Sequence, residues 1–201
     1  MKELQTILDA VRKAPDVSCA LATVVRAHNS DDYPAGAMLL CLPSGETVGA
    51  IGREALAIEV KAAARQILAT GKPRVLVFTP DQSTVETGPD EILVEQAEPH
   101  FLRTLEAAQQ EGRALVVASI FETRGDHRQQ LRTLALIDDT GRWRGRESDR
   151  TDLGRLWDAS RNALATGHSG VLTHHLGDGI ATTFLRVIHP SSNRQAGDDQ
   201  G

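Results

Sequence analysis

The tetrapeptide Leu68-Ala69-Thr70-Gly71 (LATG) occurs again, unchanged, at residues 164–167 of this 201-residue chain. Around it, further segments match in the same order: LQTILDA (4–10) with LRTLEAA (102–108), ALATVV (20–25) with ALVVAS (114–119), and SGETVG (44–49) with TGRWRG (140–145). Ordered matches over most of a chain indicate an internal repeat. We therefore expect one domain, residues 1–190, made of two similar halves, 1–99 and 100–190, followed by a disordered tail, 191–201.

Apolar periodicity and turn residues predict α-β-β-β-α-β-β in each half. In the first half we expect a helix from Leu4 that ends before Pro15, a helix at 53–69 capped by Gly71, and strands at 19–25, 38–42, 47–51, 75–78 and 92–94. In the second half we expect helices at 101–110 and 149–165 and strands at 115–121, 131–137, 171–174 and 180–187. The predicted fold class is α/β, with α+β as the alternative, and the two halves share one mixed-sheet core.

Composition and charge exclude several classes of function. The net charge of −5 and the 3% aromatic content give no reason to expect nucleic-acid binding. Two cysteines, Cys19 and Cys41, cannot build a disulfide framework, and they favour a reducing cytoplasm. No apolar run approaches the ~20 residues that span a bilayer, so we expect neither export nor a membrane anchor.

The strings ALATVV (20–25), SDDYPAGAML (30–39), SGETVGAIG (44–52) and LATGKPRVLVF (68–78), in this order, resemble the N-terminal domain of the XdhC/CoxI family. The second half resembles the divergent second portion of the same family domain. Proteins of this family assist the maturation of molybdenum hydroxylases such as xanthine dehydrogenase. The resemblance therefore implies binding of molybdenum cofactor and contact with a target enzyme or its maturation factors.

The chain departs from the family pattern in three places. A glycine-glycine-cysteine segment is replaced by Arg53-Glu54-Ala55, and a cysteine-glycine-glycine segment by Glu86-Thr87-Gly88, so both family cysteines are absent. Many family members also continue into a Rossmann domain, whereas this chain ends soon after His189-Pro190. We accordingly expect no NAD or other dinucleotide site. If the family's thiolates hold the soft metal, we also expect this chain to bind the molybdenum cofactor weakly.

The positions carried over as candidate cofactor-binding residues are Ser30, Gly36, Gly49 and Glu59. Gly52 and Arg53 join them because a glycine loop that enters a helix offers free backbone N–H groups to an anion, and an arginine can bind phosphate through two parallel hydrogen bonds. The alternative interpretation is structural. Glycines often supply positive φ in turns, and a glutamate on a helix usually faces solvent.

The second half contains a basic cluster, Arg142, Arg144 and Arg146, which would share one face of a strand. It is a candidate partner surface, and the alternative is a charged edge strand that resists aggregation. No nucleophile elbow, phosphate loop or zinc helix occurs in the sequence, and the neighbouring rings of His174 and His175 would point to opposite faces of a strand. We therefore name no catalytic or metal-binding residues. Cys19 is expected to be buried and inert, and Cys41, at a strand end, to be partly exposed.

The leading hypothesis is a non-enzymatic, chaperone-like accessory protein for a molybdenum hydroxylase. One alternative is a cofactor-free scaffold or regulatory protein. The other is a small hydrolase or transferase that uses residues near the second-half turns, such as His168 and Asp178. Unpaired sheet edges are compatible with a symmetric homodimer.

Overall fold

The computed structural model describes residues 2–13, 17–28, 33–52, 54–79, 88–97, 99–125, 131–138, 140 and 154–190. Its first half contains α1 (Lys2–Lys13), β1 (Cys19–Arg26), β2 (Met38–Cys41), β3 (Thr47–Gly49), α2 (Glu54–Thr70), β4 (Arg74–Phe78) and β5 (Asp90–Ala97). Its second half contains α3 (Pro99–Gln110), β6 (Leu115–Arg124), β7 (Arg132–Asp138), α4 (Gly154–Thr166), β8 (Gly170–Leu176) and β9 (Gly179–Ile188).

The strands form two separate sheets. The first sheet has the order β3-β2-β1-β5-β4 and the second has the order β7-β6-β9-β8. Every neighbouring pair of strands is antiparallel. The predicted α/β class is confirmed, but the strands of the two halves do not join into one mixed sheet, because each half pairs its strands internally. The internal repeat itself stays a prediction, and the segment that would match β3 lies outside the described residues.

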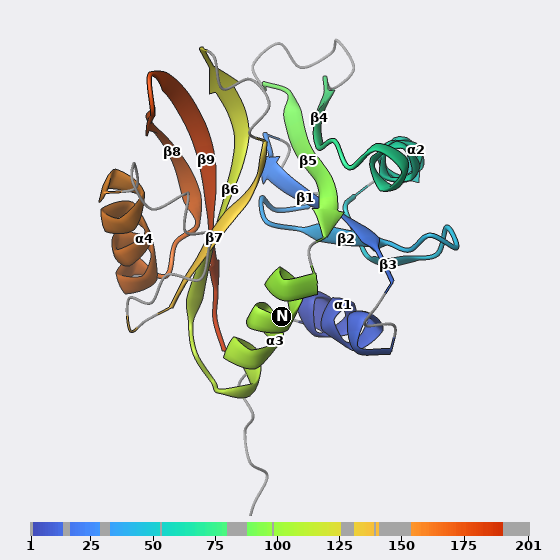
Figure 1. Cartoon of the computed structure of the whole chain (residues 1–201), viewed down its shortest axis with the longest axis horizontal. Coiled ribbons are helices and arrows are strands. Elements are labelled where there is room, and N and C mark those ends of the chain that lie inside the picture. The colour runs from blue at the N-terminus through green and yellow to red at the C-terminus, as the bar shows by residue number, and fades with distance from the viewer. Residues whose placement is uncertain are drawn as a thin grey trace, which may run out of the picture.

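The two sheets face each other, and each is covered on its outer side by one helix (Figure 1). Helix α2 packs on the first sheet through an apolar cluster that includes Val60, Ile67 and Val94. Helix α4 covers the second sheet, where Leu156 packs with Ile120. This arrangement explains why the first seven residues of both β1 and β6 are buried and mostly apolar, since both faces of these strands are covered.

The inner faces of the sheets make the contact between the two halves. At one end, Val25 and Leu93 of the first sheet meet Phe121 and Phe184 of the second. At the other end, α1 and α3 close the space between the sheets, and their Leu, Ile and Ala side chains form one apolar cluster with residues of both sheets (Figure 1). The two halves therefore share buried surface although they share no sheet.

Both copies of LATG end a helix in the same way. The amide of Gly71 donates to the carbonyl of Ile67 at 2.7 Å, and that of Gly167 donates to Ala163 at 2.8 Å. Both glycines have positive φ, +67° and +71°. This is the left-handed C-terminal cap that the sequence predicted for Gly71, and it explains why glycine follows the last apolar turn.

Candidate functional site

The candidate glycines of the first half all adopt positive φ: +93° at Gly36, +100° at Gly49 and +86° at Gly52. Packing also restricts two of them. A Cβ at Gly49 would lie 2.4 Å from the backbone carbonyl oxygen of Met38, and one at Gly52 would lie 2.0 Å from the ring of Tyr33. Positive φ favours glycine at all three positions, and the lack of space for a Cβ requires it at Gly49 and Gly52. This agrees with the structural interpretation of these glycines. Their part in binding a ligand stays a prediction.

The ring of Tyr33 that covers Gly52 is held by a buried carboxylate. The Tyr33 hydroxyl donates to Asp90 Oδ2 at 2.6 Å, and Asp90 Oδ1 accepts the backbone N–H of His28 at 2.7 Å. Asp90 is only 6% exposed. The imidazole of His28 in turn lies where a Cβ on Gly88 would be. Asp90 thus joins the segment that contains His28 to the one that contains Tyr33, and the side chains of these two residues cover Gly88 and Gly52.

A second carboxylate organises the hairpin of β2 and β3. Glu3, in the first turn of α1, accepts the backbone N–H of Met38 at 3.0 Å and that of Ala50 at 3.3 Å through its Oε1. Ala50 follows Gly49 directly. Because carboxylates accept backbone N–H groups with charge-assisted hydrogen bonds, Glu3 fixes α1 to the hairpin that carries this glycine.

Arg186 reaches this region from β9, in the other half of the chain. Its side chain packs on Gly36, where a Cβ would lie 3.2 Å from Arg186 Nε. Burial lowers the pKa of Arg186 to about 10, and the charge of Glu3 partly opposes that shift. Nη1 of Arg186 is buried without a hydrogen-bond partner. Sequence reasoning missed Glu3 and Arg186, and the only signal for the latter is a single charge within the apolar run of β9.

The other candidate residues are not brought to this cluster by the described structure. Glu59 is exposed on α2, as expected of a residue on a solvent-facing helix side. Ser30 and Arg53 lie outside the described residues, and so do Arg142, Arg144 and Arg146. Their proposed roles stay predictions.

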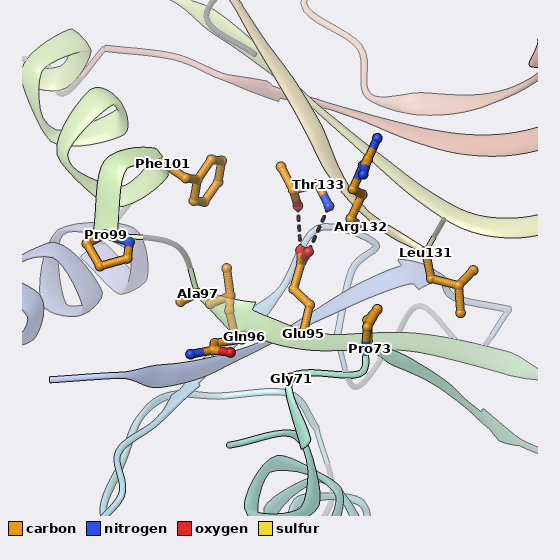
Figure 2. A pocket seen from close by; sticks show the side chains of 11 residues that line it. Gly71, Pro73, Glu95, Gln96, Ala97, Pro99, Phe101, Leu131, Arg132 and Thr133 are labelled. Carbon is orange, nitrogen blue, oxygen red and sulfur yellow. Dashed lines mark hydrogen bonds between the residues drawn. The ribbon is translucent and has the colours of Figure 1, made fainter. Parts of the chain in front are cut away.

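A cavity of about 520 Å³ lies elsewhere, between β5, β7 and the start of α3 (Figure 2). Glu95 projects into its wall from β5 and accepts two hydrogen bonds from Thr133, from the backbone N–H at 2.7 Å and from the hydroxyl at 2.5 Å. Among the described residues, the candidate cofactor residues Gly36, Gly49, Gly52 and Glu59 do not line it, whereas Phe101, Leu131 and Gln96 do. Its size suits a small molecule, but Glu95 and Thr133 bind each other across it, so we interpret the pair as a clamp between the two sheets.

The histidines of the second half do not form a catalytic site in the described structure. His174 is buried, with Nε2 at 2.8 Å from Thr183 Oγ1 and Nδ1 at 2.9 Å from the carbonyl oxygen of His175. His175 is exposed, which confirms that the two rings point to opposite faces. His168 and Asp178 lie exposed in separate turns. Within the described ranges no three His, Cys, Asp or Glu side chains are grouped as metal ligands would be.

Both cysteines are buried. This is as expected for Cys19, but the expectation that Cys41 is partly exposed is wrong: only 4% of it is exposed, because β2 lies between β1 and β3 and beneath α2. Burial raises the pKa of both thiols, that of Cys41 to about 11.

We expect the native thiols to react with an aromatic disulfide reagent at pH 8 at least ~100-fold more slowly than the thiols of the urea-unfolded chain, because the thiolate is the reacting form. The measurement is the release of the coloured thiol over time, with and without urea. Rapid release of one equivalent from the folded protein would contradict the burial of both side chains.

No helix in the described part of the chain is long and apolar enough to cross a membrane.

Fold and site together define a class of protein: a two-sheet α/β domain in which one glycine turn, at Gly36, lies beside a largely buried arginine, with no cluster of metal-ligating side chains among the described residues. The model of the XdhC and CoxI family matches residues 13–79, which confirms the resemblance for this part of the chain. The matched segment runs from the end of α1 through β4 and contains Gly36, Gly49 and Gly52.

Among solved structures, the chain is similar to a crystal structure described as a xanthine dehydrogenase from Bacillus halodurans. The TM-score is 0.66 at 15% sequence identity, and the match covers 95% of this chain and 54% of the other. The likeness therefore concerns the fold of nearly the whole chain, which spans about half the length of that protein. A search of curated proteins found no match.

Proposed function

We propose that this protein is a non-enzymatic accessory factor in the assembly of a molybdenum hydroxylase and that it binds either the molybdenum cofactor or the target enzyme. The observation that carries the proposal is the family match over residues 13–79, since this segment forms the β2–β3 hairpin and its glycine turns. Proteins of the XdhC/CoxI family serve such maturation. The similar fold of a protein described as a xanthine dehydrogenase supports the same assignment.

The described residues suit the organic, anionic part of the cofactor better than its metal. Gly36 lies beside the Arg186 side chain, and a guanidinium is the kind of group that receives a phosphate. The thiols of Cys19 and Cys41 are buried and protonated at neutral pH, so they offer no thiolate to a soft metal. When bound, the cofactor would supply the molybdenum chemistry of the target enzyme, and this chain would hold and shield it.

The test is retention of molybdenum cofactor by the pure protein. After anaerobic incubation and gel filtration, the released pterin is measured by its fluorescence. If the protein carries the cofactor, the pterin stays with it, and Arg53→Ala reduces the retained amount at least ~10-fold because a phosphate contact is lost. Arg65→Ala is the matched control, since Arg65 is an exposed arginine on α2. Retention that Arg53→Ala leaves unchanged would move the site away from the start of α2.

The absence of an accessible thiol among the described residues favours one alternative, a cofactor-free scaffold. In that case the folded protein retains no pterin but binds a purified molybdenum hydroxylase or maturation factor in gel filtration. The double variant Arg144→Glu, Arg146→Glu should then weaken the complex by reversing the charge of the proposed partner surface. Equal complex formation by this variant would reject the basic cluster as that surface.

A further inference from the structure

The most unusual charge in the described structure is Arg186, which has no partner. Of the half-buried arginines, Arg26 binds Glu91 at 2.8 Å, and Arg113 binds Glu111 at 3.0 Å and Asp138 at 3.3 Å. Arg186 forms neither a hydrogen bond nor an ion pair with the described residues, and its Nη1 is fully buried. A guanidinium that loses water without gaining a partner costs free energy.

The carboxylate whose charge acts on Arg186, that of Glu3, does not pair with it. Glu3 acts on Arg186 through its charge, but its Oε1 already accepts two backbone N–H groups, from Met38 and Ala50. The chain as a whole carries a net charge of −5. Pairing with Glu3 within the described structure therefore does not account for the burial of the Arg186 guanidinium.

Gly36 gives Arg186 its position. With φ +93° and no side chain, it lets the guanidinium stem lie against its Cα, 3.2 Å from where a Cβ would be. Arg186 therefore sits beneath the turn that leads into β2, at the contact between the two halves. A planar guanidinium fits two oxygens of a phosphate through parallel N–H donors, which a lysine cannot imitate.

We propose that Arg186, together with the Gly36 turn, forms a phosphate-binding site at the junction of the two halves of the chain. The bound group is a tetrahedral oxyanion, either free phosphate or the phosphate ester of a larger ligand. The second half thus completes a site whose glycine turn comes from the first half. The inference rests in part on the proposed function, because the same glycine turn is a candidate cofactor contact, but phosphate binding can be measured without any cofactor.

The experiment is calorimetric titration of inorganic phosphate, and separately of ribose 5-phosphate, into the full chain in a buffer free of phosphate and sulfate. We expect saturable binding at one site. Arg186→Met should weaken it at least ~10-fold, and Arg186→Lys should weaken it less, since charge remains but the paired donors are lost. Arg161→Met is the matched control, because Arg161 is exposed on α4. Stronger binding of the ester than of free phosphate identifies a larger ligand.

Stability provides a second readout. Without phosphate, Arg186→Met should melt at the same or a higher temperature than the wild type, because an apolar side chain replaces an unpaired buried charge. Phosphate should raise the melting temperature of the wild type more than that of Arg186→Met, with Arg186→Lys between them. If Arg186→Met fails to fold, the phosphate affinity of Arg186→Lys is compared with that of the wild type, and a lower affinity supports the proposal.

Absence of saturable phosphate binding by the wild type, or equal affinity in the folded Arg186 variants, would overturn the proposal. Phosphate binding in a protein that retains no cofactor and binds no molybdenum hydroxylase would leave this site standing and reject the proposed function. Equal cofactor retention by the wild type and Arg186→Met, with no saturable phosphate binding by either, would do the reverse.

Discussion

Replacing Gly49 by alanine should lower the free energy of unfolding by about 2–4 kcal/mol, because a side chain at positive φ and an overpacked contact each cost free energy. The new Cβ would lie 2.4 Å from the carbonyl oxygen of Met38. That oxygen belongs to the neighbouring strand of the hairpin, where Leu39 pairs with Gly49, so it cannot turn away as a flexible side chain could. Urea unfolding followed by circular dichroism measures the loss.

The matched control for this prediction is Gly112→Ala. Gly112 also has positive φ, +66°, but nothing lies within 4 Å of its added Cβ. It should cost only about 1 kcal/mol, the penalty for the backbone conformation. If both substitutions cost the same, the close approach of the Gly49 backbone to Met38 does not constrain the hairpin.

Glu95→Ala should lower the free energy of unfolding by about 2–4 kcal/mol, since it leaves the partly buried N–H and hydroxyl of Thr133 without this acceptor. The carboxylate, 9% exposed, binds both donors of Thr133 across the space between the sheets (Figure 2). Ser119, on β6, extends this network with its hydroxyl 2.9 Å from that of Thr133. Removal of the Glu95 carboxylate therefore weakens the contact between β5 of the first half and β7 of the second half.

Two further variants test whether the hydrogen bonds, rather than the volume of Glu95, carry this effect. Glu95→Gln keeps an acceptor for the Thr133 N–H and should restore about half of the lost stability. Gln96→Ala changes an exposed neighbour on the same strand and should stay within about 0.5 kcal/mol of the wild type. Equal losses in Glu95→Ala and Gln96→Ala would show that the clamp does not stabilise the protein.

The glycines show how far local reasoning reaches. Positive φ could be anticipated at Gly36 and Gly49 because each stands in a turn between apolar segments. The need for glycine at position 52 could not be anticipated in the same way, because it depends on the ring of Tyr33, which occupies the space of a Cβ. That ring is held by Asp90, which lies far along the chain on β5. A contact between distant segments leaves no periodic signal in the sequence.

The sequence by itself determined the elements. Apolar spacing placed α1, α2 and α3 and all the described strands to within a few residues, and Gly71 ended its helix where the cap was expected. These features depend on side-chain period, helix-ending residues and turn chemistry, all of which act over a few residues. The ordered strings of the first half were also sufficient to indicate the family whose model matches residues 13–79.

Only the tertiary structure decided how these elements pair and what meets between them. Apolar strands buried on both faces do not encode their neighbours, so the sequence could not separate one mixed sheet from two antiparallel sheets. The burial of Cys41, the clamp of Glu95 on Thr133 and the placement of Arg186 under the Gly36 turn each join residues from different strands or halves. Such contacts arise from the packing of sheets and helices against each other, and no local pattern in the chain specifies them.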